Sequence, residues 1–200
     1  MELALVVFYT LLFIFLIYRL NFFSINGLSK KIISGIFILK IGFAYLLFFI
    51  YYYYYGNDRL KIDAFRFFDD SLVMYQSLKD GPVVFLKLFL GIDEENPATQ
   101  PYIKNMLFWN KTHNYGLFND NRTIIRFNAI LNLFSFGHYH VNNVFMSFVS
   151  LLGLTGIYKA AINQIAAFRL PLAAGIFLIP SVLFWGSSAL KEGIVIFGLG

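Results

Sequence analysis

Long apolar runs constrain the fold of this chain more than any other feature of its sequence. Residues 3–18, 142–158 and 170–185 carry no charged side chain, and residues 32–55 carry one, Lys40. A helix needs about 20 mostly apolar residues to cross roughly 30 Å of hydrocarbon. The four runs therefore predict transmembrane helices.

The composition excludes several classes of protein. Hydrophobic residues make up 58% of the chain and charged residues 14%, whereas soluble domains carry about 25% charged residues. Cysteine is absent, which excludes disulfides, a thiol nucleophile and cysteine-ligated metals. The net charge of +5 comes from dispersed lysines and arginines. This charge fits membrane topology and contact with lipid headgroups, so no nucleic-acid partner is expected.

The end of the chain predicts a fifth, incomplete span. The run from Glu192 to Gly200 is too short to cross a bilayer. We therefore expect an all-α polytopic transmembrane protein that is a fragment of a longer chain. The predicted parts are two transmembrane helices in residues 1–55, an outer loop in residues 56–122, and further transmembrane helices in residues 123–200.

Basic residues predict the orientation of these spans. Arg19, Lys30 and Lys31 flank the first short loop, and Lys159 and Arg169 flank a later one. Short loops rich in lysine and arginine stay in the cytoplasm. The chain is thus expected in a bacterial inner membrane, with the loop of residues 56–122 on the periplasmic side.

The outer loop is predicted to contain amphipathic helices that lie along the membrane surface. Residues 56–126 contain nine basic and nine acidic residues. Residues 70–78 favour a helix, Gly81-Pro82 interrupts it, and residues 83–90 form a second apolar stretch. Residues 124–136 predict another helix, with Asn128, Asn132 and Ser135 on one face.

The acidic cluster Asp63, Asp69 and Asp70 is the first candidate site. Helical spacing places Asp63, Arg66 and Asp70 on one face. Adjacent carboxylates can bind a hard cation or supply a general base. A structural alternative is open: Arg66 pairs with Asp70, and Asp69 caps a helix that begins at Ser71.

Two groups of cations are candidates for binding phosphate. Lys191 adjoins a predicted helix N-terminus, where free N–H groups favour anions. Arg122 and Arg126 lie one helical turn apart, and arginine suits fork-like contacts with phosphate. The alternatives are a lysine that extends to the membrane surface and arginines that anchor a helix at the headgroups.

The sequence leaves the presence of a metal unknown. His138 and His140 alternate and can ligate a metal if this stretch is extended, but no third ligand is evident. We favour the alternative that these residues form a polar break between two membrane helices. A divalent cation at the acidic cluster is the remaining candidate cofactor.

Two features of residues 51–200 resemble the GT-C superfamily of polyprenyl-phosphate-sugar-dependent glycosyltransferases. One is the large outer loop with acidic residues and amphipathic helices, and the other is the series of hydrophobic spans joined by short loops. Two stretches also look like uncharacterised multi-span proteins of the Bacteroidetes type. They are Asp-Ala-Phe-Arg-Phe-Phe-Asp-Asp at residues 63–70 and Pro-Ser-Val-Leu-Phe-Trp-Gly-Ser-Ser-Ala-Leu-Lys-Glu at residues 180–192.

The resemblance implies roles for the candidate residues. In GT-C enzymes an outer-loop aspartate acts as general base or positions the acceptor, sometimes with a divalent cation, and basic residues hold the lipid phosphate. The resemblance implies that Asp69 or Asp70 is the aspartate that acts as general base or positions the acceptor, with Asp63 as the next candidate. The phosphate would contact Lys191, Arg126 and Arg122.

Two functions follow as hypotheses. The first is a cell-envelope glycosyltransferase that moves a sugar from a polyprenyl-phosphate carrier to a glycan or lipid acceptor at the outer face. The second is a non-catalytic membrane subunit of an envelope polysaccharide or secretion assembly, in which the acidic loop docks protein partners. A transporter is less favoured, because Lys40 is the one ionisable residue deep within a predicted span.

Overall fold

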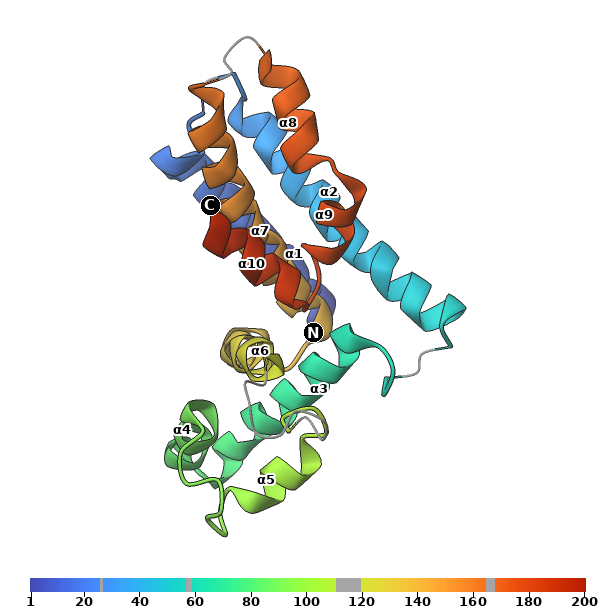
Figure 1. The fold of residues 1–200 in the computed structure, drawn as a ribbon, viewed down its shortest axis with the longest axis vertical. Coiled ribbons are helices and arrows are strands. Elements are labelled where there is room, and N and C mark those ends of the chain that lie inside the picture. Colours follow the sequence, from blue (N-terminus) through green and yellow to red (C-terminus); the bar gives the residue numbers. More distant parts are fainter. Residues whose placement is uncertain (26, 57–58, 111–119, 165–167) are drawn as a thin grey trace. The chain divides into compact units, whose positions relative to one another are not determined.

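The computed structural model describes residues 1–25, 27–56, 59–110, 120–164 and 168–200. The described part contains ten α-helices, which confirms the prediction that the chain is all-α. The chain divides into two compact units (Figure 1). The first, the membrane unit, comprises residues 1–56 and 140–200, and the second, the loop unit, comprises residues 57–139.

Three helices of the described residues are long and apolar enough to cross a membrane. They are α1 (Glu2–Arg19), α2 (Lys30–Phe49) with its π-helical continuation (Ile50–Tyr54), and α7 (Tyr139–Ile162). They coincide with the first three predicted spans, and these three are confirmed as candidate membrane helices. The chain is therefore described as a membrane protein.

The fourth predicted span is wrong as a continuous helix. Residues 170–185 form two short helices, α8 (Arg169–Phe177) and α9 (Pro180–Trp185) (Figure 1). Proline has no backbone N–H to donate, and its ring disfavours helical geometry in the residue before it. Ile179 accordingly has extended backbone angles, with φ −61° and ψ 124°. Pro171 is tolerated because it lies in the first turn of α8.

Aromatic packing holds the membrane unit together. Phe13 of α1 stacks on Phe148 of α7, with ring centroids 4.3 Å apart, and meets Phe37 of α2 edge-on at 6.0 Å. Tyr158 of α7 contacts Phe177 of α8 at 5.7 Å. Such pairs stabilise by about 0.5–1.5 kcal/mol beyond the area they bury. The outward face of α1 exposes large apolar side chains such as Phe8 and Phe15, as a helix in lipid does.

Glycines on α7 allow the last helix, α10 (Lys191–Leu199), to approach closely. A Cβ atom at Gly153 would lie 2.2 Å from the carbonyl oxygen of Ile196. A Cβ atom at Gly156 would lie 2.2 Å from the carbonyl oxygen of Gly200. Small residues of this kind let membrane helices pack backbone against backbone.

The loop unit is built around α3 (Asp63–Gln76), which packs against α4 (Pro82–Leu90), α5 (Gln100–Asn105) and α6 (Asn121–Ser135). A 3-10 turn (Ser77–Asp80) extends α3. The predicted break is confirmed: Gly81 has φ 121°, and Pro82 is the first residue of α4. α3 begins seven residues earlier than the predicted helix, so the whole acidic cluster is helical.

The polar face of α6 is buried against α3. Asn128, Asn132 and Ser135 lie on the predicted helix, and all three are buried, which their spacing did not predict. Asn132 Nδ2 donates to Ser71 Oγ at 3.1 Å, and Ser71 Oγ donates to the carbonyl of Phe68 at 2.6 Å. Contacts group α6 with the loop unit. The assignment of residues 123–200 to transmembrane helices stays a prediction.

Candidate functional site

Asp63 and Arg66 form a local ion pair at the start of α3. Arg66 Nη1 donates to Asp63 Oδ1 at 3.2 Å, its Nε donates to the carbonyl of Leu60, and its guanidinium lies 4.5 Å from the ring centroid of Phe108. The expected pairing of Arg66 with Asp70 is wrong. Because α3 already begins at Asp63, Asp69 lies inside the helix and does not cap one at Ser71.

Asp69 is held by an arginine that the sequence pattern did not single out. Arg59 Nε donates to Asp69 Oδ2 at 2.8 Å, and Arg59 Nη2 donates to Asp69 Oδ1. The Arg59 guanidinium also lies 4.7 Å from the ring centroid of Phe65. The Asp69 side chain remains 39% exposed, so it can be reached from solvent. Arg59 lies ten positions away and outside any helix, where no periodicity indicates the pair.

Asp70 is buried and connects α3 to the segment after α5. Its carboxylate accepts hydrogen bonds from the backbone N–H of Leu107 at 3.0 Å and of Phe108 at 2.7 Å. The residue is 2% exposed. Burial raises the pKa of Asp70 from its ordinary 3.8 to about 6, although the two N–H donors act in the opposite direction. Its position suits a structural carboxylate better than one that meets a substrate.

Arg122 lies in a cluster with Glu94 and Trp109. Its Nη1 donates to Glu94 Oε1 at 2.6 Å, and its Nε donates to the carbonyl of Trp109 at 3.1 Å. The indole N–H of the fully buried Trp109 also donates to Glu94 Oε1, at 3.2 Å. Glu94 lies 28 positions before Arg122, so helical spacing gave no sign of it.

Arg126 adds a second guanidinium to this cluster. It lies 5.1 Å from the ring centroid of Trp109, and Arg122 lies 4.5 Å from the same ring. Among the described residues Arg126 makes no hydrogen bond or ion pair, and its Nε is shielded from solvent. Burial and the neighbouring Arg122 lower its pKa from the ordinary value. The cluster thus holds two guanidinium groups and one carboxylate.

The backbone makes room for this second guanidinium at Gly91. This residue ends α4 in the left-handed region, with φ 70°. A Cβ atom there would lie 2.9 Å from Arg126 Nη2. Glycine therefore satisfies both the backbone conformation and the close approach of Arg126. Two arginines over one buried ring provide planar donors that suit a phosphate or carboxylate.

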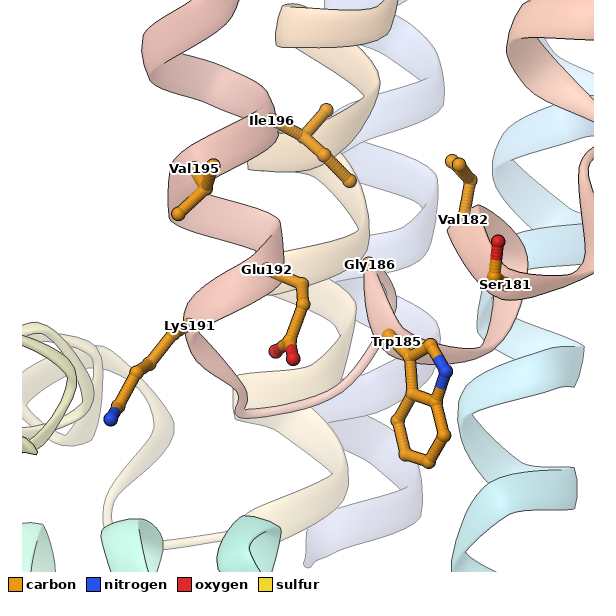
Figure 2. Close-up of a pocket in the computed structure, with 8 residues that line it drawn as sticks. All are labelled: Ser181, Val182, Trp185, Gly186, Lys191, Glu192, Val195 and Ile196. Carbon is orange, nitrogen blue, oxygen red and sulfur yellow. The ribbon is translucent and has the colours of Figure 1, made fainter.

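Lys191 adjoins a pocket in the membrane unit, between α9 and α10. The pocket has a volume of about 350 Å³ and is lined by Ser181, Val182, Trp185, Gly186, Lys191, Glu192, Val195 and Ile196. Figure 2 shows the Glu192 carboxylate on the same side as the Trp185 ring, whereas the Lys191 side chain extends away from it. The sequence reasoning nominated Lys191 and missed Glu192, the acidic residue of this pocket.

The histidine pair does not form the extended metal site considered from the sequence. α7 begins at Tyr139, so His140 is helical. Its ring stacks on Tyr45 at 4.4 Å, and its backbone N–H donates to Glu2 Oε1 at 3.1 Å. In the described ranges, no three histidine, aspartate or glutamate side chains are grouped as metal ligands.

The site residues fall into the two units. Asp63, Asp69, Asp70, Arg122 and Arg126 belong to the loop unit, and Lys191 belongs to the membrane unit. Comparison of the chain with protein families, with curated proteins and with solved structures gave no match.

Proposed function

We propose that this chain is a GT-C-like membrane glycosyltransferase that moves a sugar from a polyprenyl-phosphate carrier to an outer-face acceptor. The observation that carries the proposal is the guanidinium of Arg126. It lies on Trp109 beside Arg122 and lacks a carboxylate of its own among the described residues. A phosphate would supply the missing negative charge and accept bidentate hydrogen bonds.

In this proposal Asp69 is the general base and Asp70 is structural. Both carboxylates accept hydrogen bonds, Asp69 from Arg59 and Asp70 from backbone N–H groups. Asp69 is the better base because its side chain is 39% exposed and can meet an acceptor, whereas Asp70 is 2% exposed. The acceptor hydroxyl would lose its proton to Asp69 as its oxygen attacks the anomeric carbon. The bond from that carbon to the phosphate oxygen would break, and the carrier phosphate would leave with the electron pair. Arg122 and Arg126 would stabilise its negative charge.

A transfer assay on the full chain in membranes tests the proposal. The donor is a radiolabelled polyprenyl-phosphate sugar, and the readout is label released from the carrier. Asp69→Asn should lower kcat by about 10²–10⁴-fold, the range for general-base catalysis. Arg126→Gln should raise the KM for the donor by about tenfold or more.

Two control variants isolate these roles. Arg59→Gln removes the ion pair with Asp69 but keeps the carboxylate, so it should retain most of the activity. Lys104→Gln changes an exposed cation on α5 and should have no effect. If Asp69→Asn and Asp70→Asn both transfer at the wild-type rate, the mechanism is wrong.

A specific observation favours the second candidate, a non-catalytic membrane subunit. Each acid of residues 63–70 already has a partner within the loop unit: Arg66 for Asp63, Arg59 for Asp69, and backbone N–H groups for Asp70. Acids engaged in this way can define a docking surface without taking part in catalysis. Charge reversal at exposed Asp80 and Glu95 should then abolish co-purification of a membrane partner, while no transferase activity is detected in the wild type.

A further inference from the structure

One end of the membrane unit carries several cations and no acid. The loop between α1 and α2 and the beginning of α8 lie at this end (Figure 1). Residues 18–31 and 158–170 contain no aspartate or glutamate, and they contain five cations: Arg19, Lys30, Lys31, Lys159 and Arg169. The positive charge of this end is therefore not balanced by acidic residues of the same segments.

Two of these cations pack on the loop between α1 and α2 from other helices. Lys159 of α7 donates from Nζ to the carbonyl of Phe22 at 2.9 Å, and Nζ lies 4.6 Å from the centroid of the Phe22 ring. The side chain of Arg169, in α8, lies on Gly27, because a Cβ atom there would be 2.6 Å from Arg169 Cδ. Distant parts of the chain thus bring a lysine and an arginine to one loop.

Lys30 has a structural role at the same loop. Its Nζ donates to the carbonyls of Tyr18 at 2.7 Å and Leu20 at 3.1 Å, at the end of α1. Lysine is favoured there because it hydrogen-bonds the last carbonyls of a helix. Arg19, Lys31 and Arg169 are exposed, and their charged groups make no ion pair or hydrogen bond among the described residues.

The two acids of the membrane unit, Glu2 and Glu192, lie far from this end. Glu2 begins α1 and is about 25 Å along the helix from its last residue. Glu192 follows the buried loop of residues 186–190, whose backbone is hydrogen-bonded by Asn143 and Ser147 of α7. Lys159 lies about 18 Å farther along α7 than Ser147. Both separations exceed the Debye length of about 8 Å at physiological salt.

Helix dipoles do not supply the missing negative charge. α1 and α7 end at this end of the unit, and α2 and α8 begin there. Helix C-termini favour cations and helix N-termini favour anions, each by a similar amount. Two termini of each kind therefore offset one another, and the charged side chains determine the sign of the potential.

A small polar pocket lies beside Lys159. It has a volume of about 130 Å³ and is lined by Ser24, Ile25, Lys159, Ile162 and Asn163. The Ser24 hydroxyl and the Asn163 amide form no hydrogen bond with any residue that the structure describes. Lys159 has two further N–H donors besides the one used by Phe22. The pocket thus offers three kinds of donor and no carboxylate, which suits a phosphate group.

Exposed apolar side chains beside the cations favour a lipid over a soluble anion. Phe168 and Leu170 flank Arg169 and are 60% and 71% exposed. Phe22, which holds Lys159, is also exposed. Cations next to exposed apolar side chains match a ligand whose anionic group continues into hydrocarbon. The candidate membrane helices α1, α2 and α7 begin or end here, where headgroups are expected.

We propose that Lys159, Ser24 and Asn163 bind the phosphate of an anionic phospholipid in this pocket. Arg169 adds positive charge beside the headgroup, and the acyl chains contact exposed apolar side chains such as Phe168. The site lies wholly in the membrane unit. It does not rest on the proposed transfer reaction and uses none of the residues assigned to it.

Native mass spectrometry of the full chain in detergent tests the site. The probes are phosphatidylglycerol, phosphatidylcholine with identical acyl chains, and water-soluble glycerol phosphate. One phosphatidylglycerol molecule should bind at least tenfold more tightly than phosphatidylcholine. Equal affinities for the two lipids would overturn the site, and glycerol phosphate that binds as tightly as phosphatidylglycerol would overturn its assignment to a lipid.

Matched variants distinguish a discrete site from general attraction between a basic surface and anionic lipid. Lys159→Met keeps the length of the side chain and should weaken phosphatidylglycerol binding by about tenfold, with little effect on phosphatidylcholine. Lys31→Met removes an exposed cation of the same end that does not line the pocket, and should change binding less than twofold. Equal losses in these two variants would show diffuse attraction and would overturn the proposal.

A third variant keeps the test decisive if Lys159→Met fails to fold. Ser24 and Asn163 are exposed, and their side chains make no hydrogen bond within the described part of the chain. The double variant Ser24→Ala, Asn163→Ala should therefore fold normally and bind phosphatidylglycerol severalfold more weakly. Unchanged affinity in this variant would contradict a phosphate in the pocket.

Discussion

Arg122 contacts Trp109 in two ways at once. Its guanidinium lies 4.5 Å from the centroid of the indole ring, and its Nε donates to the Trp109 backbone carbonyl at 3.1 Å. The arginine thereby fixes both the ring and the backbone of a residue that is fully buried. This relationship orders the cation cluster before any ligand binds, which reduces the entropy that binding has to overcome.

Truncation of Trp109 should therefore destabilise the loop unit. Trp109→Ala removes a buried indole, and such changes cost about 3–5 kcal/mol. Limited proteolysis of the full chain should show faster cleavage within residues 57–139. Trp185→Ala is the control, because Trp185 is 42% exposed and belongs to the membrane unit. Equal protection of residues 57–139 in both variants would contradict the role assigned to Trp109.

The pKa of Asp70 predicts how stability depends on pH. Burial raises this pKa from 3.8 to about 6, so the folded chain binds more protons than the unfolded chain between these values. The unfolding free energy should therefore fall as pH rises from about 4 to about 6, and Asp70 should add no further slope above that range. A shift of this size corresponds to at most about 3 kcal/mol.

The Asp70→Asn variant isolates this contribution. An amide of the same shape does not titrate, so the difference in unfolding free energy between wild type and variant should decrease across that pH range. Thermal unfolding in one detergent, followed by circular dichroism at several pH values, measures it. A difference that is constant with pH would show that Asp70 does not titrate there.

The buried hydrogen bond between Asn132 and Ser71 should couple α6 to α3. Asn132 Nδ2 donates to Ser71 Oγ at 3.1 Å. A double-mutant cycle with Asn132→Ala and Ser71→Ala should give a coupling energy of about 1 kcal/mol. Thr123 is exposed and lies about 13 Å away along α6. Its cycle with Ser71 should give no coupling, and equal values for the two cycles would argue against a direct bond.

A methyl group at Gly153 should disturb the packing of α10 on α7. The added Cβ would lie 2.2 Å from the carbonyl oxygen of Ile196, so the two backbones must separate. Overpacking of this kind costs about 1–3 kcal/mol. Gly42→Ala is the matched control on α2, because nothing lies within 4 Å of its Cβ position. Thermal unfolding should show a lower midpoint for Gly153→Ala alone.

Local sequence patterns predicted a helix correctly where the apolar run or the residue spacing lies within that one helix. The spans at α1, α2 and α7 follow from apolar length, and the helix α6 follows from the periodicity of residues 124–136. The burial of Asn128, Asn132 and Ser135 was not predicted. The run at residues 170–185 failed because its average hydropathy hides Pro180. One residue without a backbone donor divided an otherwise suitable helix.

Long-range pairs in the candidate sites could not be read from the sequence. Glu94 meets Arg122 across 28 positions, and Asp70 accepts from backbone N–H groups 37 and 38 positions later. A backbone N–H donor can belong to almost any residue type, so the sequence does not reveal which residue donates. Loop residues also follow no periodic pattern from which their positions could be predicted. Glu192 was overlooked because lysine, rather than the acid after it, suggested an anion site.

The buried loop of residues 186–190 has a consequence for biogenesis. Its backbone is held by Lys40 from α2 and by Asn143 and Ser147 from α7. Synthesis proceeds from the N-terminus, so both helices leave the ribosome before the loop does. The side chains that hydrogen-bond the loop backbone are therefore already synthesised when the loop leaves the ribosome. The polar backbone of the loop can then bind these side chains and need not be exposed to lipid.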